Sequence, residues 1–196
     1  LRVKMLAGVF EHPYVDPARI PEVVHCRAHR DLALQAARES IILLTNRDRM
    51  LPLLPDVGVI AVLGPNADRA QLGDYSVVQH DAVTPLAGIQ TAAPDGVTIT
   101  HAEGCGIYDL DTDGIGDAVE RAAEANVAVV VVGGSSMVKC GVGWGSDDPN
   151  ASKATCGEGF DRTDLTLPGV QQKLVEAVVA TGTPTVVVLS HGRPYG

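Results

Sequence analysis

The chain is poor in aromatic residues and has no excess of positive charge. Aromatic side chains make up 4% of its 196 residues, so a hydrophobic fraction of 45% must draw its core from Val, Ile, Leu and Ala. The formal net charge of −9 disfavours binding to nucleic acid or to anionic membrane surfaces, since both reward Lys and Arg. No apolar run approaches the roughly 18 residues of a membrane-spanning helix. The composition therefore indicates one sizeable domain, or one domain plus an arm.

Cysteine and histidine occur in no metal-binding pattern. The four cysteines include no CxxC pair and the histidines have no ligand spacing, so we expect no metal site. Cys140 and Cys156 bracket a long polar loop; they either close it as a disulfide in an oxidising compartment or remain free thiols. The chain opens at Leu1 and stops at Gly196 directly after a strand-like run. We therefore expect cuts at both ends and assign no compartment.

Solid apolar runs separated by helical patterns predict an α/β fold. The segment 127–132 is five valines and one alanine, which is typical of a strand buried on both faces of a parallel sheet. Thr84 and Asp113 are expected N-caps, and the prolines in residues 1–25 indicate an irregular arm. The expected strands span 57–63, 97–101, 127–132 and 183–190, and the expected helices 28–45, 84–92, 113–125 and 168–180.

Three loops leave the carboxyl ends of these strands, where parallel sheets bind ligands. They are residues 64–83, residues 133–166, and the segment that begins at His191; the second far exceeds the typical connection of about 4–6 residues. Neither GxGxxG nor a P-loop pattern follows a strand, which argues against a nucleotide site. No GxSxG elbow accompanies Ser190 and His191. We interpret His191 and Arg193 as residues that shape the strand exit through hydrogen bonds.

The long loop contains a glutamate between two glycines, in the run Gly157-Glu158-Gly159-Phe160-Asp161-Arg162. Flanking glycines let a substrate approach the backbone closely, and a carboxyl group presented in this way suits proton transfer more than packing. On the hexapeptide alone, a solvated loop glutamate in a Gly-rich turn is the favoured interpretation, and the rest of the chain changes that balance. Trp144, the only tryptophan, lies in the same loop, and its indole needs a cover that either a sugar or a neighbouring domain could supply.

Several motifs in register identify a family resemblance that covers nearly the whole chain. They are Phe10–Asp16, Ala37–Asn46 with Leu51-Pro52-Leu53, Val59–Asp68, Gly73–Ser76, Thr84–Ile89, Val127–Gly133, Gly157–Arg162 with the LxLPGxQ run Leu165–Gln171, and Thr181–Pro194. Together they resemble glycoside hydrolase family 3, the β-glucosidase and β-xylosidase family. His191 departs from that pattern, because Asn is usual at its position.

The resemblance implies a domain architecture. In this family a six-stranded α/β sandwich packs on a (β/α)8 barrel, with the active site between them. Residues 1–27 would then be the end of the barrel and a linker arm, and residues 28–196 an α/β sandwich, with a mostly parallel sheet between helices on both faces, incomplete at its C-terminus. The nucleophilic aspartate belongs to the barrel, upstream of Leu1. We therefore expect the barrel as a partner and no turnover by this chain alone.

The resemblance also implies a chemistry. Glu158 corresponds to the general acid/base of a retaining β-glucosidase that acts on terminal, non-reducing β-D-glucosyl residues of β-glucosides or oligosaccharides. Asp161 and Arg162 are expected to form a local supporting pair, and Trp144 is a candidate for the aglycone-side subsite. No metal or organic cofactor is implied. The alternatives are a β-xylosidase of the same family and a non-catalytic carbohydrate-binding or interaction domain.

Overall fold

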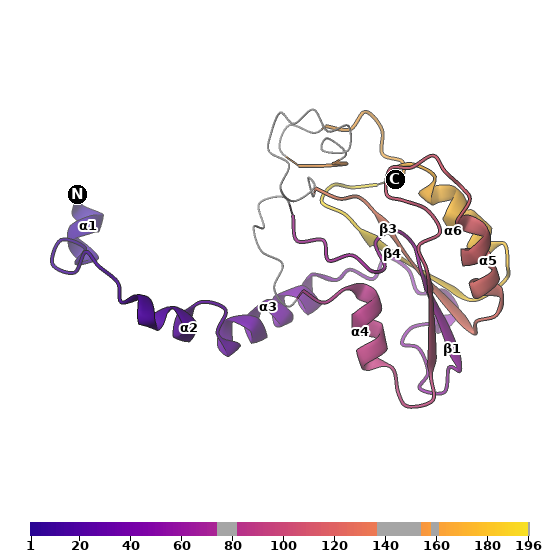
Figure 1. Ribbon diagram of the computed structural model, residues 1–196, viewed down its shortest axis with the longest axis horizontal. Coiled ribbons are helices and arrows are strands. Elements are labelled where there is room, and N and C mark those ends of the chain that lie inside the picture. The colour runs from indigo at the N-terminus through magenta and orange to yellow at the C-terminus, as the bar shows by residue number, and fades with distance from the viewer. Residues whose placement is uncertain (74–81, 137–153, 158–160, 196) are drawn as a thin grey trace. The chain divides into compact units, whose positions relative to one another are not determined.

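The computed structural model describes residues 1–73, 82–136, 154–157 and 161–195 (Figure 1). Its contacts divide the chain into two units, Leu1–Arg49 and Met50–Gly196. The domain boundary expected between residues 27 and 28 stays a prediction.

Short helices make up much of the first unit. The arm expected to be irregular contains α1 (Arg2–Leu6), η1 (Pro17–Arg19) and α2 (Ile20–Val23), so that prediction is wrong in part. The physical reason is clearest at η1, where Pro17 stands at the first position of the turn and needs no N–H partner. The Asp16 carboxylate completes the turn by accepting a 2.9 Å hydrogen bond from the Ala18 backbone N–H.

The longest helix of the first unit ends earlier than its apolar pattern predicts. Helix α3 spans Arg27–Ser40, and Ile41 has extended backbone angles, φ −73° and ψ 125°. The run Ile41–Leu44 is apolar at every position, so it lacks the polar spacing of an amphipathic helix and suits extended backbone as well. The chain continues to η2, Arg47–Arg49.

The second unit is built on a parallel sheet, as the apolar runs predict. Within the described residues its strands are β1 (Val59–Leu63), β2 (Thr98–Ala102), β3 (Val127–Gly133) and β4 (Thr185–Ser190), in the order β2-β1-β3-β4. Every pair is parallel, so all four carboxyl ends lie at one edge of the sheet. Strand β3 is buried along its whole length, because both of its faces are covered.

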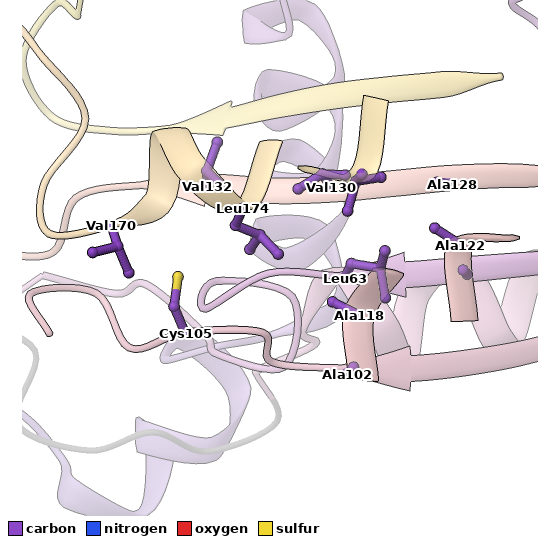
Figure 2. Close-up of a cluster of buried hydrophobic side chains, with 12 residues drawn as sticks. Leu63, Ala102, Cys105, Ala118, Ala122, Ala128, Val130, Val132, Val170 and Leu174 are labelled. Carbon is purple, nitrogen blue, oxygen red and sulfur yellow. The ribbon is translucent and has the colours of Figure 1, made fainter. Parts of the chain in front are cut away.

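Helices cover both faces of the sheet, which confirms the α/β sandwich (Figure 1). Helices α5 (Ile115–Ala123) and α6 (Gln171–Val179) pack side by side on one face, and α4 (Pro85–Ala92) lies on the other. Figure 2 shows the α5/α6 core, in which Leu174 points into the middle of the cluster. Successive residues of β3 alternate between the two cores, with Val130 and Val132 in this one and Val129 and Val131 in the α4 core.

Two of the predicted helix starts are displaced. The N-cap position of α5 is Gly114 rather than Asp113, because the Asp113 N–H bonds to Asp111 Oδ1 at 2.9 Å in a turn that precedes the helix. Helix α6 begins at Gln171 and not at residue 168, since Gly169 adopts a φ of +58° and interrupts helical backbone.

The predicted cap of α4 is confirmed and carries a stability prediction. Thr84 Oγ1 accepts the Ala87 backbone N–H at 3.1 Å and donates to Asp68 Oδ1 at 2.9 Å. We expect Thr84→Ala to lower the free energy of unfolding by about 1 kcal/mol, because it leaves an N-terminal N–H of the helix without its cap. Urea denaturation of the chain measures this. Thr91→Ala, on the same helix, is the matched control and should change stability by less than about 0.5 kcal/mol.

Candidate functional site

The loops that follow β1, β3 and β4 meet at the carboxyl edge of the sheet, where the sequence places a candidate site. They line an open pocket of about 520 Å³. Its wall includes backbone and polar side chains from all three loops, among them Gln71, Ser135, Cys156, Gly157, His191 and Arg193.

A chain of hydrogen bonds ties the loop after β1 to the loop after β3. Ser135 Oγ donates to Gln71 Oε1 at 2.8 Å, and Gln71 Nε2 donates to Asn66 Oδ1 at 2.9 Å. Asn66, which is almost completely buried, donates from Nδ2 to the Gly134 carbonyl at 3.4 Å. Because buried polar groups need partners, this network holds the two loops in one arrangement.

The long loop returns to its own starting point at Thr155. The Thr155 N–H donates to the Ser135 carbonyl at 2.8 Å, and the Ser135 N–H donates to Thr155 Oγ1 at 2.9 Å. Tyr108 Oη donates to the same carbonyl at 3.4 Å. These bonds bring Cys156 and Gly157 to the carboxyl end of β3, immediately before Glu158.

The end of β3 is held from α6 by one buried side chain. Gln171 Oε1 accepts the Gly133 N–H at 2.7 Å, while its Nε2 donates to the Gly133 carbonyl at 2.8 Å and to the Ile107 carbonyl at 2.9 Å. Gly133 itself has a φ of +138°, and a Cβ there would collide with the Ser190 carbonyl of β4. The end of β3 therefore needs glycine at position 133, and the Gln171 side-chain amide satisfies the buried backbone groups of that glycine.

Arg193 follows β4 and contacts the loop on both sides of the predicted catalytic glutamate. Its Nη1 forms an ion pair with Asp161 Oδ1 at 2.7 Å, and its Nη2 donates to the Gly157 carbonyl at 3.3 Å. The expected pair between Asp161 and Arg162 is wrong, because Asp161 pairs with this arginine of the strand exit instead. The hydrogen-bonding role inferred for Arg193 is confirmed.

Arg162 has its own partners. Its guanidinium forms an ion pair with Asp164 Oδ1 at 3.2 Å and donates to the Thr166 carbonyl. It also lies over the Tyr195 ring, 4.7 Å from the centroid, and the His191 ring meets the same ring edge-on at 5.2 Å. The residues that follow β4 therefore pack against the loop at Arg162 as well as at Asp161.

Among the described residues, the pKa values of Cys105, Tyr108 and Asp164 are shifted in directions that favour structural roles over reactivity. Burial, together with the negative charges of Glu103 and Asp109, raises the pKa of the Cys105 thiol to about 11. Burial likewise raises the pKa of Tyr108 to about 12, so this phenol remains a neutral hydrogen-bond donor. Hydrogen bonds from the Thr166 hydroxyl and backbone N–H lower the pKa of Asp164, which keeps it charged beside Arg162.

The described residues do not reach every predicted site residue. Glu158, Trp144 and Cys140 lie outside them, so their predicted roles stay predictions, and the pairing of Cys140 with Cys156 stays open; Cys156 itself is buried. Within the described ranges, no group of three or more His, Cys, Asp and Glu side chains is placed to hold a metal ion. No helix in that part of the chain is long and apolar enough to cross a bilayer.

Comparison with known proteins decides the family. Residues 41–196 match the family described as the glycosyl hydrolase family 3 C-terminal domain. The chain belongs to glycoside hydrolase family 3. The family and the α/β sandwich fold that the sequence motifs predict are therefore both confirmed for this family 3 domain.

Relatives of known name and solved structure agree with this assignment. The chain is 38% identical over 175 residues to a β-xylosidase of Formosa agariphila and 37% identical over 223 residues to the periplasmic β-glucosidase of Salmonella typhimurium, covering 85% and 99% of this chain. It spans only 22% and 27% of their lengths. A β-glucosidase structure from Erythrobacter marinus matches with a TM-score of 0.79 at 32% identity, over 96% of this chain and 27% of that one.

Proposed function

We propose that this chain is the acid/base-bearing domain of a retaining β-glycosidase and that Glu158 is its general acid/base. The observation that carries the proposal is that Gly157 and Asp161, on either side of Glu158, are bound by Arg193 at the carboxyl edge of the sheet. Parallel sheets bind ligands at this edge. Relatives named as glycosidases support the reaction class.

A second carboxylate is needed and is expected on a barrel domain. In a retaining mechanism one carboxylate attacks the anomeric carbon while the general acid protonates the departing oxygen. The residue that acted as the acid then acts as the base that activates water, and the sugar is released. The two carboxyl groups of such a pair lie about 5–5.5 Å apart. We therefore propose that a (β/α)8 barrel supplies the nucleophilic aspartate opposite Glu158, and that this chain alone is inactive.

The sugar is proposed to be a terminal β-D-glucosyl residue, with β-xylosyl as the second candidate. The second candidate is kept because the β-xylosidase and β-glucosidase relatives are almost equally similar to the chain, at 38% and 37% identity. The ratio of kcat/KM for p-nitrophenyl β-glucoside and β-xyloside, measured on the enzyme that contains this domain and its barrel, separates the two. Sugar binding without turnover would favour a non-catalytic carbohydrate-binding domain.

Product analysis with azide tests the acid/base assignment. In the Glu158→Ala enzyme, an aryl glycoside with a good leaving group still forms the glycosyl-enzyme, but water is no longer activated. Azide needs no general base, so its nitrogen attacks the anomeric carbon and displaces the aspartate carboxylate, giving the β-glycosyl azide. The exposed α5 residue Glu120 provides the control: Glu120→Ala should yield only the free sugar. Absence of the azide adduct from Glu158→Ala would place the acid/base elsewhere.

A further inference from the structure

We propose that Arg193 is a positioning residue for Glu158, acting through the two ends of the loop segment that carries it. This inference rests on the proposed function of Glu158. Arg193 donates hydrogen bonds to Gly157 and Asp161, the residues that directly precede and follow the segment 158–160. A single side chain from the exit of β4 therefore contacts the residues at both ends of that segment.

The chemistry of the contact suits fixing a loop. Guanidinium presents its donors in a rigid planar fork, and here the two terminal nitrogens reach different acceptors, the Asp161 carboxylate at 2.7 Å and the Gly157 carbonyl at 3.3 Å. The Asp161 side chain is 95% exposed, so the ion pair contributes little to overall stability. What Arg193 supplies is a link between the Gly157 carbonyl and the Asp161 side chain.

The residues next to Arg193 in the chain also pack against the loop and the end of β3. A Cβ on Gly192 would lie 3.3 Å from Cys156 Sγ, so the strand exit runs directly against the residue before Gly157. A Cβ on Gly134 would meet Tyr195 Oη, which shows that the residues after Arg193 also lie close to the end of β3. The residues that flank Arg193 in the chain therefore lie against the same loop that Arg193 contacts.

Loss of this constraint should impair proton donation more than binding. A general acid must lie within hydrogen-bond reach of the leaving oxygen, and a displacement of about 1 Å can cost on the order of 100-fold in rate. The loss should be largest for substrates whose leaving group needs protonation. Substrates with an acidic phenol as leaving group need no proton and should be spared.

The test is a leaving-group series on the intact enzyme that contains this domain and its barrel. For Arg193→Met we expect kcat/KM to fall about 10- to 100-fold on alkyl β-glucosides and less than about threefold on the 2,4-dinitrophenyl glucoside. Arg193→Lys, which keeps the charge but not the fork, should lie between Arg193→Met and wild type. Asp161→Asn removes the ion pair while leaving the bond to Gly157, and should lose several-fold on alkyl glucosides only.

The matched control is Arg69→Met. Arg69, in the loop after β1, forms an exposed ion pair with Glu103, directly after β2, at 3.1 Å, and its loss should leave the whole series unchanged. An equal loss on every substrate for the Arg193 and Asp161 variants, or no loss on any, would overturn the positioning role. Failure of the proposed function looks different, because Glu158→Ala would then show no leaving-group dependence in the same series. If Arg193→Met does not fold, Arg193→Lys and Asp161→Asn decide the question.

Discussion

Replacing Glu158 with alanine is expected to lower kcat/KM for alkyl β-glucosides by about 10²- to 10⁴-fold, the range that general acid catalysis contributes. The reason is that kcat/KM reports formation of the glycosyl-enzyme, and an alkoxide cannot leave without a proton. For the 2,4-dinitrophenyl glucoside the same parameter should change little, since that phenolate leaves unaided. Its kcat should nevertheless fall, because release of the sugar needs the general base.

Steady-state kinetics across leaving groups of graded acidity measure this effect. A steep dependence of log kcat/KM on leaving-group pKa in Glu158→Ala, against a shallow one in wild type, is the expected result. A loss of equal size for every leaving group would contradict the prediction, because it would indicate damage to binding or folding. Glu158→Gln serves as a second variant, since it keeps the size of the side chain and removes its proton-donating group.

Replacing Gln171 with leucine is expected to lower the free energy of unfolding by about 3 kcal/mol. Leucine fills a similar volume but leaves the Gly133 N–H without its 2.7 Å acceptor and two buried carbonyls without a donor. Each unsatisfied buried group costs about 1–3 kcal/mol. Urea denaturation with an unchanged m-value would assign the loss to the folded state.

The neighbouring glutamine provides the control for this substitution. Gln172 is exposed and donates to Glu176 Oε1 on the same helix at 2.8 Å. Gln172→Leu should therefore change stability by less than about 0.5 kcal/mol. If Gln171→Leu were no more destabilising than Gln172→Leu, the buried amide would not be what holds the end of β3.

The central strands of the sheet, β1 and β3, were predictable because they are apolar on both faces. The valines of β3 alternate between two cores, and no other common element tolerates such a run in a chain of this composition. Element ends were less predictable. Asp111 and Asp113 are both side-chain types that cap helices or turns. The sequence does not reveal that the Asp111 carboxylate accepts the Asp113 N–H in a turn before α5, which leaves Gly114 at the N-cap.

The contacts of the candidate site depend on distant pairs, which a linear pattern does not reveal. Asp161 and Arg162 are adjacent and oppositely charged, yet the partner of Asp161 is Arg193, brought near by the parallel pairing of β3 with β4. Gln171 did leave a signal that sequence analysis missed. It lies three and seven residues before Leu174 and Val178, so a polar amide occupies the apolar face of its helix and must have a buried partner there.

The parallel order of the sheet also has a consequence for how the polypeptide assembles. Each ladder joins residues that are dozens of positions apart, with Val59 opposite Thr98, Ile60 opposite Val127 and Ala128 opposite Thr185. No hairpin can nucleate these ladders, and closure of such long segments is slow. On the ribosome, β3 emerges well before its outer neighbour β4. The most apolar strand of the domain must therefore be protected from aggregation in the nascent chain until β4 has been made.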